Sequence, residues 1–342
     1  MNLQVEYLKK EKEPMNNSFR QTLTQKAKGF LSLLFCIVFA TAGIFFASDA
    51  LFPQSAGAYP FWAQETAPES PRDSTGRIVC ANCHLAEKEA EVKLPLSVAP
   101  DSVFEAVVHI PYDTDKQQVL GDGSKGDLNV GAVLMLPEGF KIAPEERMTE
   151  EMKEKVGDVF FQPYREGLEN VVLVGPLPGK EYQEITFPVL SPDPNENSDV
   201  YFGKYPVYLG ANRGRGQVYP AGNKSNNAVY NASQAGTITQ IADTDFGNDV
   251  TIETSDGETI VESIPPGPEL IVSKGDQVGR GDPLTNDPNV GGFGQEDSEI
   301  VLQSPARIKG LIAFIAAIML AQVLLVLKKK QVEKVQAVEM NF

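Results

Sequence analysis

Cysteine, histidine and basic residues are scarce in this chain of 342 residues. Three cysteines cannot form the dense disulfide framework of a small secreted scaffold. A structural zinc site needs four nitrogen or sulfur ligands, and outside the run at residues 80–84 the chain offers only His109 and Cys36, which lies in an apolar segment. Acidic residues outnumber basic ones by 46 to 30, and the resulting net charge of −16 argues against a nucleic-acid partner. The sequence contains no recognisable nucleophile–base constellation, so we expect no enzyme activity within this chain.

Proline and glycine are plentiful instead, at 24 and 29 residues, and short runs rich in valine and threonine recur between them. This pattern is typical of a β-rich, turn-rich chain, and the length allows about two domains. We therefore predict a mainly β fold whose large domain is an antiparallel β-sandwich. The strands are expected at residues 104–110, 130–136, 171–174, 184–189 and 200–209.

The run Cys80-Ala81-Asn82-Cys83-His84 has the spacing of a c-type haem attachment site. Within one turn of helix, Cys80 and Cys83 share a face and can bond the two vinyl groups of one porphyrin. His84 is then held beneath the ring, where its imidazole can ligate the iron. We predict one covalently bound haem c at this motif.

Two interpretations without haem compete with this one. A redox-active Cys-x-x-Cys pair accompanies a βαβ pattern, and none surrounds Cys80 and Cys83. A structural disulfide between them would close a strained two-residue loop. The first alternative function is an exported thiol–disulfide oxidoreductase that uses Cys80 and Cys83. The second is a membrane-anchored structural adaptor, built on the small β-domain expected at residues 236–286.

A six-coordinate haem needs a second axial ligand, usually methionine or histidine. The residue pattern leaves this ligand open among His109, Met135, Met148, Met152 and an unusual group. His109 lies in an expected strand, and Met135 has the surroundings of a core residue. Met148 and Met152 resemble the apolar face of a helix expected at residues 144–156.

The N-terminus has the features of an export signal. Residues 1–28 are polar and carry lysine and arginine, residues 30–47 are apolar, and Ala56-Gly57-Ala58 offers small residues to a signal peptidase. We predict that residues 1–58 are removed, and we hypothesise that Met15 is the true start because it gives a signal of ordinary length. An uncleaved transmembrane helix is the alternative.

The C-terminal region is predicted to anchor the chain. Residues 311–327 are apolar except for Gln322, and Lys328-Lys329-Lys330 follow. We expect a transmembrane helix at residues 306–330 with its lysines on the cytoplasmic-equivalent side, and a short tail at residues 331–342. Gln322 is expected to face another protein group, as in a subunit of a larger complex.

Residues 236–286 have short runs of strand type punctuated by glycine and aspartate, at residues 236–238, 250–252, 259–261, 270–272 and 275–278. They suggest a small β-domain similar to lipoyl or biotinyl carriers. Lys274 is its only lysine and does not lie at the expected hairpin tip, so we expect the carrier fold without carrier chemistry. The domain is inserted between residues 59–235 and residues 287–305 of the large domain.

Several motifs resemble the cytochrome f family, the c-type subunit of the cytochrome b6–f complex. They are Tyr59-Pro60 after the Ala-x-Ala site, residues 75–84, 128–133, 136–140, 212–217 and 288–294, and the tail at residues 328–330 and 339–342. The resemblance spans the whole predicted mature chain. It implies an elongated large domain, the inserted lipoyl-like domain and one C-terminal transmembrane helix.

The resemblance also implies a set of site residues. The sixth iron ligand would be the α-amino nitrogen of Tyr59, freed by signal cleavage, since an α-amine with a pKa of about 8 deprotonates readily for a metal. The haem surroundings would be Pro60, Trp62, Asn129, Tyr219 and Pro220. An internal water chain would be lined by Asn212, Gln217, Asn227 and Asn289. Turn formation by asparagine is the competing interpretation of those last positions.

The family function implied is photosynthetic electron transport in the thylakoid membrane. Electrons would pass from an iron–sulfur protein of the complex to soluble plastocyanin or a small c-type cytochrome. The haem domain would lie in the lumen and the tail on the cytoplasmic or stromal side. The complex, which also contains a b-type cytochrome and small subunits, is a plastoquinol–plastocyanin reductase. This chain would be its electron-transfer subunit and not itself an enzyme.

One departure from plant members concerns charge. Residues 59–305 carry 18 basic and 40 acidic residues, and a lysine-rich docking ridge is reduced to Lys125 between Asp122 and Asp127. We therefore expect weak attraction to an acidic carrier, or a carrier that presents a basic face.

Overall fold

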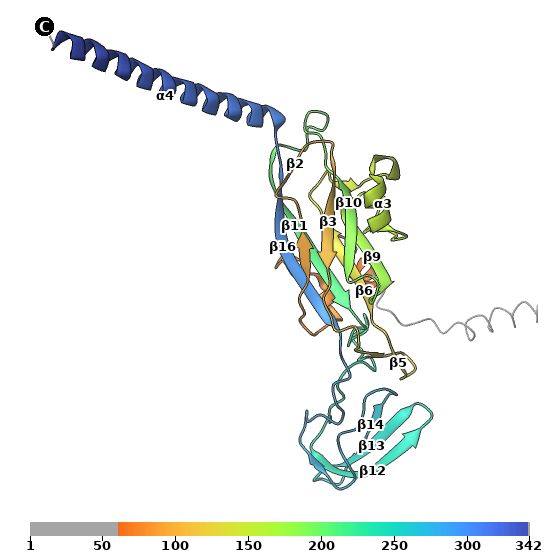
Figure 1. Cartoon of the computed structure of the whole chain (residues 1–342). Helices are drawn as coiled ribbons and strands as arrows, with labels where there is room; N and C mark the ends of the chain where they lie inside the picture. Colours follow the sequence, from red (N-terminus) through yellow and green to blue (C-terminus); the bar gives the residue numbers. More distant parts are fainter. Residues whose placement is uncertain (1–60, 341–342) are drawn as a thin grey trace, which may run out of the picture. The chain divides into compact units, whose positions relative to one another are not determined.

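The computed structural model describes residues 61–340. The predicted signal peptide, with its alternative start Met15, lies outside the described residues, as do Tyr59 and Pro60. Within the described residues the fold is mainly β, with several sheets and one long C-terminal helix, which confirms the predicted fold class (Figure 1).

The largest sheet has six strands in the order β2-β16-β11-β6-β9-β8. Neighbouring strands are antiparallel, except that β2 runs parallel to β16. The pairing of β11 with β16 extends from Gly203 opposite Leu302 to Arg213 opposite Gly292. The strands are β2 (Ser97–Val98), β6 (Asn129–Met135), β8 (Gln162–Pro163), β9 (Val171–Pro178), β11 (Gly203–Arg213) and β16 (Gly292–Leu302).

A second, four-stranded sheet packs against the first to form a sandwich. Its order is β1-β3-β10-β7, made of β1 (Glu91–Lys93), β3 (Val103–His109), β10 (Glu184–Leu190) and β7 (Lys141–Ile142). Alternate residues of β3 are buried, as expected when one face of a strand covers a core. Together with alternate residues of β11 they form one cluster: Phe104, Ala106 and Val108 with Val207, Leu209 and Ala211.

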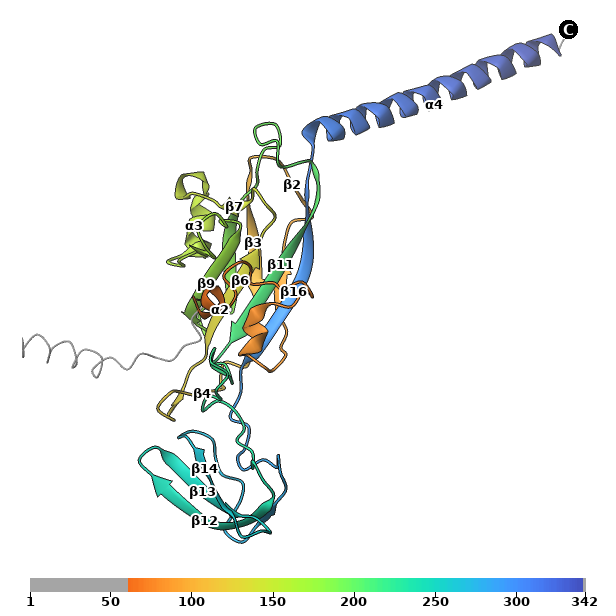
Figure 2. The same ribbon diagram turned by 180° about the vertical axis from the view of Figure 1, so that it is seen from behind.

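The opposite face of the six-stranded sheet carries a second, smaller cluster. The short helix α2 (Phe61–Thr66) and the 3₁₀ helix η1 (Val79–Asn82) lie across this face (Figure 2). Both contribute partly buried residues to the cluster, among them Ala63 and Cys80. Its buried members are Ile78, Val133, Tyr164, Val171, Leu173 and Phe293.

A separate four-stranded sheet has the order β14-β13-β12-β15 and its own core, which includes Ile238, Val250 and Ile252. It comprises β12 (Gly236–Thr244), β13 (Gly247–Glu253), β14 (Thr259–Ile264) and β15 (Gln277–Val278). The expected strand at residues 270–272 is wrong, because only Leu270 forms an isolated bridge, to Thr285. Pro283 follows along the opposing segment and has no N–H to extend a ladder.

The remaining short elements are the hairpin of β4 (Gln118–Val119) and β5 (Lys125–Gly126), the 3₁₀ helix η2 (Glu145–Arg147) and the helix α3 (Glu150–Val156). The helix expected at residues 144–156 is thus split at Thr149, whose side chain caps α3 by accepting from the Met152 N–H. Met152 and Val156 are the buried residues of α3.

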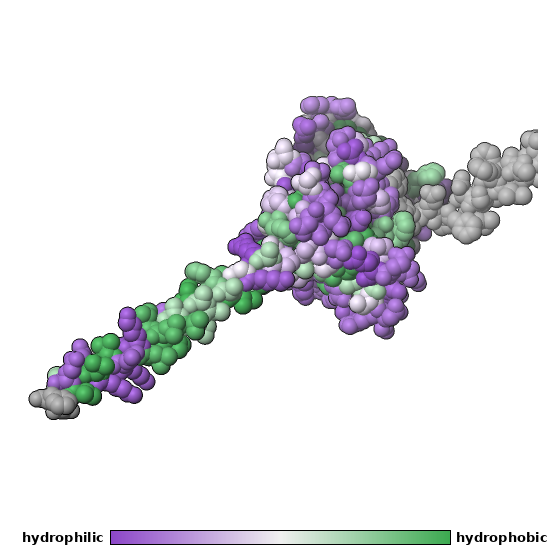
Figure 3. Space-filling model, turned by 90° about the horizontal axis from the view of Figure 1, so that it is seen from above, coloured by the Kyte–Doolittle hydropathy of each residue, from purple (hydrophilic) through white to green (hydrophobic). Residues whose placement is uncertain are grey.

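The C-terminal helix α4 (Pro305–Glu339) is the one helix of the described residues that is long and apolar enough to cross a membrane. Figure 3 shows apolar side chains along it, with hydrophilic ones gathered toward its C-terminal end. The prediction placed the end of this helix at residue 330, but the helix continues to Glu339. Residues 331–339 contain no glycine or proline, and Lys329 pairs with Glu333 one turn later, so nothing there ends the helix.

Candidate functional site

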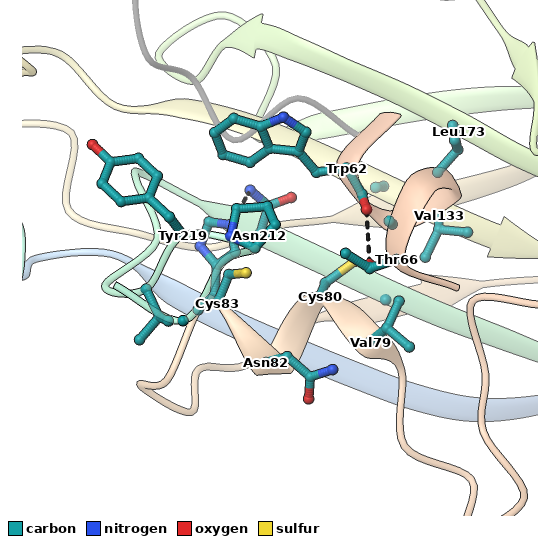
Figure 4. A pocket seen from close by; sticks show the side chains of 17 residues that line it. Trp62, Thr66, Val79, Cys80, Asn82, Cys83, Val133, Leu173, Asn212 and Tyr219 are labelled. Carbon is teal, nitrogen blue, oxygen red and sulfur yellow. Dashed lines mark hydrogen bonds between the residues drawn. The ribbon is translucent and has the colours of Figure 1, made fainter. Parts of the chain in front are cut away.

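A cavity of about 330 Å³ lies between α2, η1 and the outer face of the six-stranded sheet (Figure 4). This volume falls at the lower end of the range of roughly 300–1,000 Å³ found for ligand pockets. The lining is mostly apolar and comes from segments far apart in the chain. It consists of Trp62, Ala63, Thr66, Val79, Cys80, Asn82, Cys83, His84, Ala132, Val133, Leu173, Gly210, Asn212, Val218, Tyr219, Pro220 and Gly222.

The motif residues reach this cavity because η1 is a tight turn. The Cys83 and His84 N–H groups both donate to the Cys80 carbonyl oxygen, at 3.2 and 3.0 Å. This turn puts both sulfur atoms on the cavity side, while Asn82 points away (Figure 4). No disulfide joins the two cysteines. The expected one-turn geometry of the motif is therefore present.

His84 is 4 % exposed, and one of its ring nitrogens has no hydrogen-bond partner in the described part of the chain. Its Nε2 lies 3.4 Å from the Asn212 side-chain nitrogen, and its Nδ1 is the unpartnered atom. Burial, followed by the positive charge of Arg213, lowers the pKa of His84 to about 4. The imidazole is therefore neutral at pH 7, which is the form that ligates a metal ion.

The two thiols are poor candidates for redox exchange. Removal from water raises the pKa of Cys80 to about 12 and also raises the pKa of Cys83. Thiol–disulfide exchange requires the thiolate, which is stabilised in electropositive, accessible surroundings. The thiol–disulfide oxidoreductase alternative is accordingly disfavoured.

Two aromatic residues form one wall of the cavity. The rings of Trp62 and Tyr219 meet edge to face, with centroids 6.1 Å apart and an interplanar angle of 76°. The Thr66 hydroxyl donates to the Trp62 carbonyl oxygen at 2.8 Å, which ties the end of α2 to its start. Pro220 follows Tyr219 in the lining. The wall is therefore built from two segments more than 150 residues apart.

The residues present fit a covalently held haem. Two sulfur atoms and a neutral imidazole face one apolar cavity, and this is the donor set that c-type attachment requires. Apolar walls suit the body of a porphyrin and exclude water from its iron.

The predicted site residues divide into two groups. Trp62, Cys80, Cys83, His84, Asn212, Tyr219 and Pro220 line the cavity, whereas Asn129, Gln217, Asn227 and Asn289 do not. The Asn129 carbonyl oxygen accepts from the Gly214 N–H at 2.7 Å, which supports the loop after β11.

The three other amides lie in a buried or half-buried polar cluster behind the motif. The Gln217 Oε1 accepts from the Leu85 N–H at 2.8 Å, directly after His84. Asn227 is completely buried, and its Nδ2 contacts the Asn289 Oδ1 at 3.3 Å. The Asn227 Oδ1 has no hydrogen-bond partner within residues 61–340.

None of the four conventional ligand candidates lines the cavity. His109 belongs to β3 of the other sheet, and Met152 is buried under α3. Met135 packs against the cluster near the cavity without lining it, and Met148 ends η2.

Sequence analysis missed the sheet residues that form the cavity floor. Ala132 and Val133 come from β6, Leu173 from β9 and Gly210 from β11. A side chain at Gly210 would meet Ile78 and Phe293 within about 3 Å, so glycine makes room there. The sequence does show pairs of small residues at Gly131-Ala132 in β6 and Gly210-Ala211 in β11. They identify the cavity floor only when the two strands are known to be paired.

A buried hydrogen-bond network extends from the cavity wall. The Arg215 Nη2 donates to the Tyr219 hydroxyl at 3.3 Å, and its Nη1 donates to the Val119 carbonyl at 2.9 Å and to the Asn226 Oδ1 at 2.6 Å. The Asn226 Nδ2 in turn donates to the carbonyl oxygens of two loops, those of Leu120 and Pro266, at 2.8 Å each.

Replacing Asn226 with alanine is expected to lower the free energy of unfolding by about 2–4 kcal/mol, because buried partners, one of them charged, lose their hydrogen bonds. Chemical denaturation measures this loss. The matched control is Asn223→Ala at an exposed position, expected to change the free energy by less than about 0.5 kcal/mol. Equal effects of the two substitutions would contradict a structural role for the network.

Comparison with known proteins gives concordant results. A family model described as "Apocytochrome F, N-terminal" matches residues 59–214, and one described as "Apocytochrome F, C-terminal" matches residues 226–342. A protein named cytochrome f from Rippkaea orientalis is 68% identical over 319 residues, covering 93% of this chain and 97% of the relative. Another from Mastigocladus laminosus is 64% identical over 334 residues, covering 96% of this chain and all of the relative.

Proposed function

The chain belongs to the cytochrome f family, and we propose that it is the membrane-anchored, electron-carrying c-type subunit of a cytochrome b6–f complex. The observation that carries this proposal is the convergence of Cys80, Cys83 and His84 on one apolar cavity. A haem bound there supplies reversible one-electron chemistry through its iron. The protein provides attachment, ligation and exclusion of water.

Cys80 and Cys83 attach one haem c through their sulfur atoms, and His84 ligates the iron through Nε2. The attachment is supported by the cavity-facing sulfur atoms (Figure 4). Ligation by His84 is supported by burial, which lowers the pKa of the imidazole and keeps it neutral at pH 7. Nε2 is the ring nitrogen that lies beside the cavity-lining Asn212. The buried Nδ1, free of protein partners, then orients the ring through a bound water.

The second axial ligand is the α-amino nitrogen of Tyr59, exposed when the signal peptide is cleaved after Ala58. Tyr59 precedes the cavity-lining Trp62 by three residues, which a chain spans in at most about 11 Å. The match to the N-terminal family model also begins at residue 59. The conventional candidates, such as Met135, stay outside the cavity lining.

Pro60, Trp62, Asn129, Tyr219 and Pro220 form the haem surroundings. The edge-to-face contact between Trp62 and Tyr219 supports a wall that keeps water from the iron. Asn129 does not line the cavity, and its contribution is indirect: its carbonyl oxygen accepts a hydrogen bond from the Gly214 N–H and so supports the loop after β11.

Asn212, Gln217, Asn227 and Asn289 line a chain of internal waters that starts at His84. Two buried atoms without protein partners, the His84 Nδ1 and the Asn227 Oδ1, support this assignment. Buried polar atoms of this kind are usually satisfied by ordered water.

The domain division and the orientation follow the family. Residues 59–235 and 287–305 form the large haem domain, and residues 236–286 form the lipoyl-like domain. Helix α4 anchors the chain in the thylakoid membrane by a single pass, with the haem domain in the lumen. The three lysines at 328–330 support a cytoplasmic or stromal location for the C-terminal end.

The electron donor is the iron–sulfur protein of the complex, whose other subunits include a b-type cytochrome and small subunits. The acceptor is soluble plastocyanin or a small c-type cytochrome. The large excess of acidic over basic residues in residues 59–305 favours an acceptor with a basic face.

Stopped-flow electron transfer from the haem-loaded, reduced chain tests the proposal. With a basic-faced carrier, the second-order rate constant is expected to fall on the order of tenfold from low to physiological salt, because screening removes the attraction. An acidic-faced carrier is the matched control and is expected to react slowly at low salt. Rates with the basic carrier that stay flat or rise with salt would refute the docking mode, and a chain that transfers no electron would refute the function.

A further inference from the structure

Arg213, the last residue of β11, is completely buried. It lies on the strand face that also carries Leu209 and Ala211 into the core between the two sheets. Charged side chains are almost never fully buried unless they are paired, so this position needs an explanation.

Among residues 61–340 the guanidinium has no carboxylate at ion-pair distance. Its Nη2 donates to the backbone carbonyl oxygen of Glu89, and its Nε and Nη1 have no partner among the described residues. The Glu89 residue itself is exposed, so solvent weakens the effect of its carboxylate. Burial lowers the pKa of Arg213 to about 10, which leaves it charged at pH 7.

Arg213 follows directly after Asn212, the residue that contacts the proposed iron ligand His84. The preceding residue, Asn212, points to the opposite face of the sheet and reaches His84. Alternation along β11 therefore puts a fixed positive charge just behind the sheet on which the cavity rests.

We propose that the uncompensated charge of Arg213 raises the reduction potential of the haem, an inference that rests on the proposed function. Reduction adds one electron to the site, and a nearby buried cation stabilises the reduced state relative to the oxidised state. The many acidic side chains of residues 59–305 act in the opposite direction, but solvent and salt screen those that are exposed. A buried charge is screened far less, so a single arginine can outweigh several surface carboxylates.

Arginine suits this role better than lysine. A guanidinium keeps its proton under nearly all conditions, whereas burial readily neutralises an ammonium group. The charge at position 213 is therefore constant over the working pH range, and so is its contribution to the potential.

Spectroelectrochemical titration of the haem-loaded mature chain, which begins at Tyr59, tests this proposal with Arg213→Gln and Arg213→Leu. Each is expected to lower the ratio of reduced to oxidised haem at a fixed potential about tenfold, as for a unit charge acting over about 12 Å at an effective dielectric constant of about 20. This corresponds to a decrease of about 59 mV in midpoint potential. The leucine variant is included in case the glutamine variant does not fold, because an apolar residue commonly replaces a buried ion without loss of stability.

Two further variants separate charge from packing. Arg213→Lys, measured at a pH low enough to keep the amine protonated, is expected to retain most of the wild-type potential. Lys204→Gln removes an exposed cation from the same strand, one that pairs with Glu299, and is expected to leave the potential unchanged.

The inference would be overturned if Arg213→Gln and Arg213→Leu both kept the wild-type midpoint potential. It would also be overturned if Arg213→Lys, measured with its amine protonated, lowered the midpoint potential as much as Arg213→Gln does. Either result, obtained with a normal haem spectrum, leaves the proposed function intact. A wild-type chain that binds no haem would instead refute the proposed function.

Discussion

Replacing both Cys80 and Cys83 with serine is expected to abolish covalent haem attachment completely. Serine hydroxyls do not form the thioether bonds that hold the porphyrin, and the remaining His84 ligates only the iron. Each single substitution is expected to leave one bond. Haem-specific staining after denaturing electrophoresis measures the loss directly, because only covalently bound haem stays with the chain.

The matched control for this experiment is Thr66→Ser, which changes another cavity-lining residue without touching an attachment point. It is expected to keep its stain. Covalent haem in the double serine variant would show that another residue makes the attachment. A wild-type chain that lacks haem and has alkylation-sensitive thiols would restore the thiol–disulfide interpretation, while a colourless chain with unreactive thiols would favour the structural adaptor.

Adding one residue before Tyr59 is expected to abolish the low-spin spectrum of the mature chain. The extra residue moves the free α-amine away from the iron and replaces it with an amide nitrogen, which is a very poor ligand. Optical spectra of the oxidised and reduced protein, compared with those of a chain that begins at Tyr59, measure the change.

The control here is Tyr59→Phe, which keeps the terminal amine and is expected to keep the low-spin spectrum. Identical spectra of the extended and the unextended chain would contradict amine ligation and return the sixth ligand to His109 or a methionine. Because Tyr59 becomes a terminus only after processing, the prediction also makes export a precondition for the finished site.

The sequence allowed the main strands to be predicted because their composition and their bounding turns are local. Residues 104–110 are rich in apolar and β-branched side chains and are bounded by turn-forming residues, and β3 was found within one residue of the expected bounds. The motif at residues 80–84 was equally local, since its chemistry depends on spacing within one turn. Leu270 shows the opposite case: its run has strand composition, but a ladder depends on the partner segment, which contains Pro283.

The cavity floor could not be predicted for a related reason. Val133, Leu173 and Gly210 belong to three strands whose adjacency is decided by the order β11-β6-β9 in the sheet. No local pattern encodes that order. Arg213 also escaped notice, because within the sequence it reads as part of a polar loop, and only the long pairing of β11 with β16 draws it into the core.

The pairing of Arg213 with Gly292 has an evolutionary consequence. The chain leaves the sandwich and re-enters it at neighbouring positions of one ladder, so everything between them is topologically an enlarged hairpin loop. The entropic cost of closing such a loop grows only slowly with its length. The part of this loop at residues 236–286 contains no residue of the cavity wall or of the amide cluster behind the motif. It can therefore be lengthened, shortened or exchanged over generations while the parent sheet keeps its register, which makes this junction a natural place for lineages to diverge.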